Sequence, residues 1–188
     1  MKEIEINKQA MLSEHFSLGE MTKTSYHTVD GNIPSRVAIE NLINLCENWL
    51  EELRFSYNLL YGRMYGQSPT REGQSPCNPV AGLPSHTGDS PCASACASEE
   101  PIVINSGYRS AEVNRMCGGA TNSNHLTGCA VDIRCKDKKQ AIRYGCILLD
   151  IADGKKMDFD ELILEKRGTT IWVHFAVKPR GNRRYIDF

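Results

Sequence analysis

Residues 159–177, FDELILEKRGTTIWVHFAV, decide the fold class of this chain of 188 residues. β-Branched and aromatic residues, which favour strands, gather on both sides of a turn at residues 166–168. The stretch therefore predicts two strands joined by that turn. Upstream, residues 129–135 (CAVDIRC) alternate as a further strand, which places Asp132 on the face opposite Val131.

Segments with helical spacing surround these strands. Apolar residues recur with that spacing in residues 37–53 and 137–152, which predicts two longer helices. Ser17 followed by Glu20 forms a capping-box pattern and predicts a short helix there, and residues 111–117 predict another. Together these elements predict an α+β fold, in which a small antiparallel sheet has helices packed on it.

Two segments fit neither period. Residues 66–100 are rich in Gly, Ser and Pro, and we expect them to form a flexible insertion or surface loop within one domain of residues 1–188. The tail, residues 178–188 (KPRGNRRYIDF), is locally basic; we expect it to be a solvated terminus, and the alternative is a contact with anionic cell-wall polymer.

The composition is that of a soluble globular protein, with 40% hydrophobic and 24% charged residues. A formal net charge of -1 gives no sign of a nucleic-acid or membrane-surface partner. No apolar run approaches the roughly 20 residues of a membrane span, and the N-terminus lacks the apolar core of a signal peptide. We therefore expect a cytoplasmic protein as synthesised, with its eight cysteines mostly reduced.

The strongest chemical signal is SNHLTGCAVD, residues 123–132. Imidazole and carboxylate groups are both good zinc ligands, which makes His125 and Asp132 candidates. Asp132 shares a strand face with the small Ala130, which leaves room for an ion. A carboxylate within an apolar strand also needs a partner, because an unpaired buried charge is costly.

The third candidate ligand is His174, in the strand WVHF of residues 172–175. A lone histidine in an apolar strand is more often a satisfied core residue than a ligand. Here it completes a set of three ligand-type side chains in a chain with five histidines. Three protein ligands with one open position are typical of catalytic zinc sites, whereas structural sites have four.

These motifs, in this order, resemble the zinc D-Ala-D-Ala carboxypeptidase family, and most of all its small single-domain members from bacteria and phages. The resemblance is weak over residues 12–65 and strong over residues 101–178, where SGYRS (106–110), residues 123–133, a strand that ends in Glu, and WVH (172–174) follow one another. It implies an α+β fold of the hedgehog/DD-peptidase type, one zinc ion, and hydrolysis of peptide bonds in peptidoglycan stem peptides. It places the zinc ligands at His125, Asp132 and His174.

The resemblance also assigns roles to residues around the metal. Glu165 matches the general base of the family, although the loop before Trp172 is longer than in close relatives, and Glu161 is the alternative. Strand periodicity puts both glutamates on one face, so it cannot separate them. Arg109 matches the arginine that positions substrate, and Ser123 matches either a substrate-contacting serine or a turn residue that bonds its own backbone.

The predicted function is therefore a zinc-dependent peptidase, either a D-Ala-D-Ala carboxypeptidase or an endolysin-type endopeptidase. Its expected partners are stem peptides or muropeptides, and we expect a monomer. A holin or another route would have to deliver the protein to a substrate in the cell wall. One alternative is a non-catalytic, zinc-stabilised binding module on the same fold. A second is a phage structural protein that carries a degraded peptidase domain.

Overall fold

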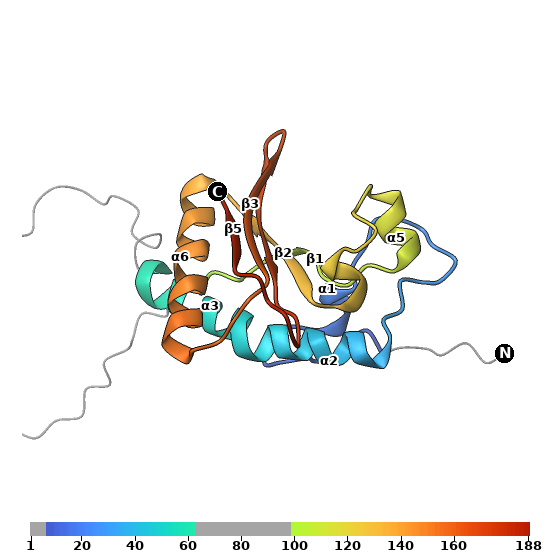
Figure 1. The fold of residues 1–188 in the computed structure, drawn as a ribbon, viewed down its shortest axis with the longest axis horizontal. Helices are drawn as coiled ribbons and strands as arrows, with labels where there is room; N and C mark the ends of the chain where they lie inside the picture. Colours follow the sequence, from blue (N-terminus) through green and yellow to red (C-terminus); the bar gives the residue numbers. More distant parts are fainter. Residues whose placement is uncertain (1–6, 63–98) are drawn as a thin grey trace, which may run out of the picture.

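The computed structural model describes residues 7–62 and 99–188 of the chain, and in it a five-stranded sheet carries the fold. The strand order is β1-β2-β4-β3-β5. Helices lie on both sides of the sheet, with α6 against one side and α1 and α5 on the other (Figure 1). The strands are β1 (Ile104–Ser106), β2 (Ala130–Cys135), β3 (Glu161–Arg167), β4 (Thr170–Ala176) and β5 (Tyr185–Asp187).

This arrangement is the expected α+β type, but the sheet is mixed rather than wholly antiparallel. β1, β2, β4 and β3 pair antiparallel to their neighbours, whereas β5 pairs parallel to β3. β5 lies in the tail that we expected to be a solvated terminus. The tail instead covers the edge of β3, where Leu162 is in register with Ile186, and so pairs backbone groups that an open edge would leave exposed.

The turn of the β3–β4 hairpin is shorter than the sequence predicted and lies later in the chain. The strands extend to Arg167 and from Thr170, and only Gly168 and Thr169 form the turn. Gly168 has φ +61°, a left-handed conformation that glycine adopts without steric cost and that suits a two-residue hairpin loop. The long hairpin brings Ile163 opposite His174 and Glu165 opposite Trp172.

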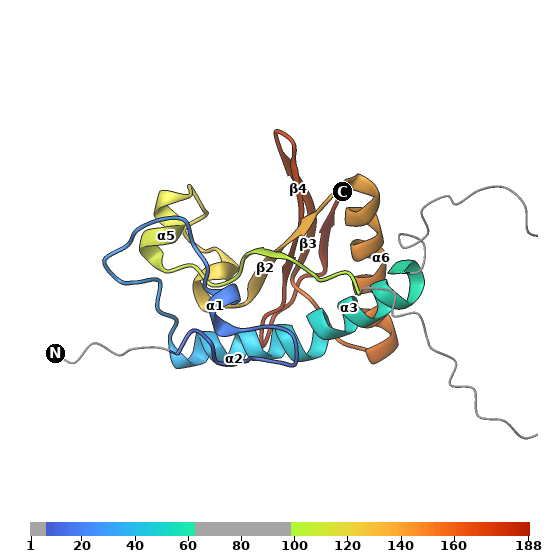
Figure 2. The ribbon, with the colours of Figure 1, turned by 180° about the vertical axis from the view of Figure 1, so that it is seen from behind.

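One long helical segment runs along the base of the molecule, beneath the sheet (Figure 2). It begins after Ser35, whose Oγ accepts a hydrogen bond from the backbone N–H of Ala38 at 3.2 Å. Val37, at its start, is exposed rather than part of the predicted apolar stripe. The segment comprises α2 (Arg36–Leu45), the π-helical turn η1 (Cys46–Leu50), α3 (Glu51–Tyr57) and a second π-helical turn η2 (Asn58–Gly62).

The other predicted helices are present. Ser17 caps α1 as the capping-box pattern predicted, and Ser110 and Asp137 cap α5 and α6 through their side-chain oxygens. No helix within residues 7–62 and 99–188 is long and apolar enough to cross a membrane. The bounds are α1 (Leu18–Met21), α5 (Ala111–Met116), the 3₁₀ helix η3 (Asn124–Thr127) and α6 (Lys138–Lys155).

The hydrophobic core fills the space between the sheet, α6 and the long helical segment. Trp49 of that segment packs on Phe175 of β4 with ring centroids 4.9 Å apart, and the ring centroid of Phe159 lies 5.7 Å from that of Phe175. Val173 and Phe175 are fully buried in this core. Because side chains alternate along a strand, His174 between them points to the opposite face of the sheet.

The predicted insertion at residues 66–100 falls almost entirely outside the residues that the structure describes. Its last residue, Glu100, is described and is bonded to the fold. The backbone N–H of Glu100 donates to Asn58 at 2.7 Å, and its carboxylate accepts from Gln140 at 2.8 Å.

Candidate functional site

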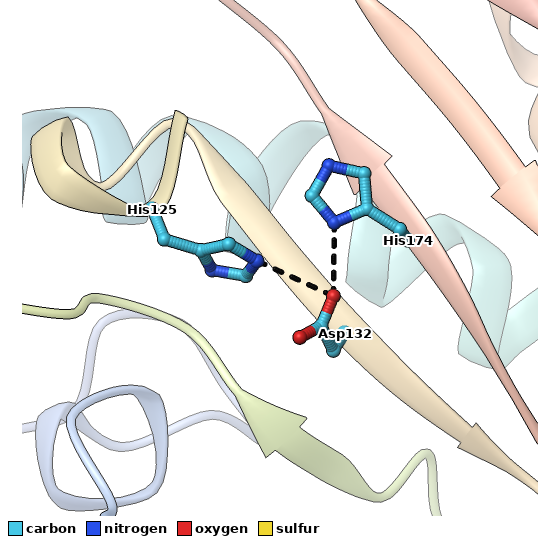
Figure 3. A group of neighbouring side chains, drawn as sticks. All are labelled: His125, Asp132 and His174. Carbon is cyan, nitrogen blue, oxygen red and sulfur yellow. Dashed lines mark hydrogen bonds and ion pairs between the residues drawn. The ribbon is translucent and has the colours of Figure 1, made fainter. Parts of the chain in front are cut away.

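Three predicted ligands, His125, Asp132 and His174, lie together on the face of the sheet opposite the core (Figure 3). They come from η3, β2 and β4, respectively. Asp132 and His174 are direct neighbours in the pairing of β2 with β4. One donor atom from each of the three residues lies within 4.8 Å of the others.

His125 is fixed by its backbone surroundings. Gly128, at the end of η3, has φ +71°, and a Cβ there would lie 2.4 Å from the carbonyl oxygen of Ala38. Glycine therefore allows the turn to pack closely on α2. The ring of His125 is buried, and its Nδ1 lies 2.5 Å from the carbonyl oxygen of Gly107. Since a carbonyl can only accept, Nδ1 carries the proton in this contact, which leaves Nε2 as the nitrogen that would bind a metal ion.

His174 faces Asp132 through Nδ1, whereas His125 faces it through Nε2. Nδ1 of His174 lies 2.9 Å from Oδ1 of Asp132, and its Nε2 lies 3.3 Å from Oε2 of Glu161. Burial alone would lower the pKa of His174, but hydrogen bonds to the two carboxylates outweigh it and raise that pKa to about 9. The hydrogen bond from His174 is also the main reason that the pKa of Glu161 falls to about 2.

Asp132 is the centre of the cluster. Its Oδ1 faces Nε2 of His125 at 3.3 Å as well as Nδ1 of His174. Burial would raise the pKa of this carboxyl, yet the two imidazoles hold it well below its usual range. The second oxygen, Oδ2, pairs with Nη2 of Arg109, whose Nε donates to Ser106 at 2.8 Å.

The donor set fits a metal ion. Nitrogen and oxygen ligands lie about 2.0–2.2 Å from zinc in a tetrahedral site, which puts neighbouring donor atoms roughly 3.4 Å apart. The separations of 3.3 Å and 2.9 Å between Asp132 Oδ1 and the two imidazole nitrogens are close to that value, and all three donor atoms lie within 4.8 Å of one another. Nε2 of His125, Oδ1 of Asp132 and Nδ1 of His174 would hold the ion, while Gly107 and Glu161 orient the two rings from behind.

The cluster lies in a cleft of about 820 Å³ that also receives Arg109, Ser123 and Glu165. Its walls come from the loop after α1, from the segment between α5 and η3, and from the β3–β4 hairpin. Among the Lys, Arg, Asp and Glu residues that line the cleft, the basic ones outnumber the acidic ones. The basic residues that line it are Lys23, Arg109, Arg167, Lys178 and Arg183.

The remaining predicted site residues are also in the cleft, with different surroundings. Ser123 is the N-cap of η3, and its Oγ accepts from the backbone N–H of His125 at 3.4 Å, so it has the turn role that the sequence allowed. Glu165 lines the cleft two positions beyond Ile163 on the same strand face as Glu161. Among the described residues, the side chain of Glu165 has no hydrogen bond or ion pair, whereas that of Glu161 has several.

Three residues beside the site were missed by the sequence analysis: Asn124, Asp160 and Arg183. Asn124 donates to the carboxylates of Asp160 and Glu161, and Arg183 pairs with both as well. The sequence offered one signal for this group: Asp160 is a charged residue directly before an apolar strand. The partners of Asp160 are far away in sequence, so no local pattern identifies them.

One comparison with known proteins is positive. Residues 95–154 match the family model of the M15 peptidases, described as Peptidase M15. No curated protein matches the chain. The matched segment carries Arg109, Ser123, His125 and Asp132 but ends before β3 and β4. Residues 95–154 are therefore similar to the M15 peptidases, which are metal-dependent, and the possible metal site that His125 and Asp132 form with His174 is in keeping with that similarity.

Proposed function

We propose that this protein is a zinc peptidase that hydrolyses peptide bonds in peptidoglycan stem peptides, on a fold of the hedgehog/DD-peptidase type. The observation that carries the proposal is the convergence of His125, Asp132 and His174 in an open cleft that Glu165 also lines. The similarity of residues 95–154 to the M15 peptidases supports the same chemistry.

The ligand set favours zinc and a catalytic rather than a structural site. Two imidazoles and one carboxylate supply three protein ligands, and a catalytic zinc site leaves its remaining position to water or substrate. A zinc ion bound there would polarise the scissile carbonyl and lower the pKa of a water molecule to ~7.

Glu165 is the proposed general base. It would take a proton from the attacking water while the water oxygen bonds to the carbonyl carbon, and then return that proton to the amine as the C–N bond breaks. A base needs a carboxylate that is free to meet a water molecule, and Glu165 lines the cleft without a partner among the described residues.

Glu161, the alternative base, has a different role in this proposal. Its Oε2 lies against Nε2 of His174, on the side of the ring away from Asp132. Carboxylates in that position orient a ligand histidine and raise its basicity. Asn124 and Arg183 also hold Glu161, which leaves it poorly placed to accept a proton from water.

Arg109 and the cleft walls would bind the substrate. Arg109 already contacts Ser106 and Asp132 with two of its donors, and a guanidinium has further N–H groups for a substrate carbonyl or carboxylate. Lys23 and Arg167 add positive charge to the walls. Stem peptides carry free carboxylates, which makes them suitable occupants of such a cleft.

The decisive experiment is mass spectrometry of purified muropeptides after incubation with the zinc-loaded protein, with and without a chelator. We expect a loss of D-Ala or cleavage of a stem bond that the chelator abolishes and the Glu165→Gln variant lacks. If protein shown to hold one zinc leaves every muropeptide intact, the peptidase proposal is wrong and a zinc-stabilised binding module becomes the better interpretation.

A further inference from the structure

Asp160 and Glu161, two acidic residues at the start of β3, are tied to the C-terminal segment. Asp160 is fully buried, and a buried carboxylate is costly unless ionic or hydrogen-bonding partners surround it. Arg183 provides a fork, with Nε 2.9 Å from Oδ1 and Nη2 2.9 Å from Oδ2. Its backbone N–H donates to Oδ1 at 3.2 Å, and Nζ of Lys178 lies 2.8 Å from Oδ2.

The same arginine also reaches Glu161. Nη2 of Arg183 pairs with Oε1 of Glu161 while it bonds Asp160, so one guanidinium spans both carboxylates. Asn124 bridges the pair from the other side, with its Nδ2 at 2.9 Å from Asp160 and 2.8 Å from Glu161. Arg183 and Asn124 thus both hold the carboxylate of Glu161, which also contacts the ring of His174.

These contacts connect the tail to two of the candidate metal ligands. Arg183 lies two residues before β5, Asn124 lies in η3 immediately before His125, and Glu161 contacts His174 of β4. η3 and β4 are far apart in sequence, so their relative position depends on contacts of this kind. We propose that Arg183 is a positioning residue of the metal site: it holds Glu161 and through it sets His174, while its pairing with Asp160 ties the same guanidinium to Asn124 of η3, next to His125.

This inference rests on the proposed metal site, and its physical basis is the orientation of ligands by their neighbours. Partners behind a ligand histidine fix its ring, and their loss costs metal affinity about 10–100-fold. A guanidinium suits this position better than an ammonium group, because its planar fork can bond two carboxylates at once. The side chain of Arg183 is 54% exposed and lies outside the apolar core, but its replacement removes ionic partners of the buried Asp160, so Arg183→Gln should also lose some stability.

The test is the zinc affinity of purified protein, measured by competition with a chromophoric chelator. We expect Arg183→Gln to weaken zinc binding about 10–100-fold, and Arg183→Lys to fall between Arg183→Gln and the wild type. Arg184→Gln is the matched control, because Arg184 is the next residue and pairs with Asp153 and Asp158 away from the cleft. It should bind zinc like the wild type. The melting temperature of each metal-free variant checks that all are folded.

A double-mutant cycle with Glu161→Gln distinguishes positioning from general loosening. If Arg183 acts through Glu161, the double variant binds zinc little more weakly than the weaker single variant. Additive losses, equal losses in Arg183→Gln and Arg184→Gln, or wild-type affinity in Arg183→Gln would each overturn the inference. Zinc binding that follows the expected pattern in a protein without peptidase activity would refute the proposed enzyme while the positioning role stands. A wild-type protein that binds no zinc would refute both.

Discussion

Glu161 and Glu165 lie on one face of β3, on either side of Ile163, yet their surroundings have little in common. Glu161, at the start of the strand, is held by His174, Asn124 and Arg183. Glu165, nearer the hairpin turn, lines the cleft, and its side chain has no hydrogen bond or ion pair among the described residues. One end of the strand face is therefore an organised polar network, and the other is open to a ligand.

The contrast indicates how one strand can supply both a residue that orients a metal ligand and a residue that transfers protons. A residue that orients a ligand must be fixed, because the geometry of the site depends on it. A residue that moves protons must be able to meet water and substrate, and so it gains from an open position. The two glutamates meet these opposite requirements within one strand.

The largest effect is expected at the open end of the strand. Glu165→Gln should lower kcat for muropeptide cleavage by about 10²–10⁴-fold, the usual contribution of a general base. Zinc affinity should stay at the wild-type value, because Glu165 contacts none of the candidate ligands. Steady-state kinetics at saturating zinc, combined with metal analysis, check both parts. Activity that survives in this variant would remove Glu165 from the mechanism and leave Glu161 as the candidate base.

The opposite face of β3 offers a second contrast. Leu162 lies between Glu161 and Ile163 but points into the core, where it is fully buried. Leu162→Ala should lower the free energy of unfolding by about 2–5 kcal/mol, since it opens a cavity in packed surroundings. Zinc affinity of the folded variant should change little. Denaturant unfolding and zinc competition separate the two, and a large loss of affinity would mean that the two faces are not independent.

The sequence predicted much of the fold because its regular parts have local causes. The alternation in residues 129–135 predicted β2, and the capping box at Ser17 predicted the start of α1. β5 was missed because three residues with charged neighbours show no period. Its pairing with β3 depends on the edge that β3 exposes, which is a property of the folded sheet.

In the candidate site, too, features with local causes were predicted from the sequence, whereas features that depend on tertiary contacts were not. His125 and Asp132 were found because ligand types recur within one short segment, and His174 because a histidine interrupts an apolar strand. The structure brings the three together. The roles of Glu161 and Glu165 could not be separated, because the difference lies in partners such as Arg183 that only the tertiary fold brings near. Arg109 was expected to face substrate, and its contact with Asp132 is likewise a tertiary feature.

A smaller effect is expected at the organised end of the strand. Glu161→Gln should weaken zinc binding about 10–100-fold, because the amide orients His174 less firmly than the carboxylate does. At saturating zinc, kcat should remain near the wild-type value, in contrast to Glu165→Gln. Zinc competition and kinetics over a range of zinc concentrations measure the two quantities. If kcat collapses in this variant while zinc stays bound, the proposed roles of the two glutamates are reversed.

The smallest expected difference between the variants is a shift in the pH at which zinc affinity reaches its plateau, which also depends on Glu161. In the metal-free protein the pKa of His174 is raised to about 9, so below that pH a proton must leave Nδ1 or Nε2 as the metal binds. Zinc affinity should therefore rise by about tenfold per pH unit across the neutral range and level off as pH approaches the pKa of His174. Loss of the Glu161 carboxylate removes one of the two partners that raise this pKa. In Glu161→Gln the plateau should therefore begin at a lower pH, whereas in Glu165→Gln it should not move. Zinc competition at a series of pH values compares the three proteins, and coincident curves would mean that Glu161 does not act on His174.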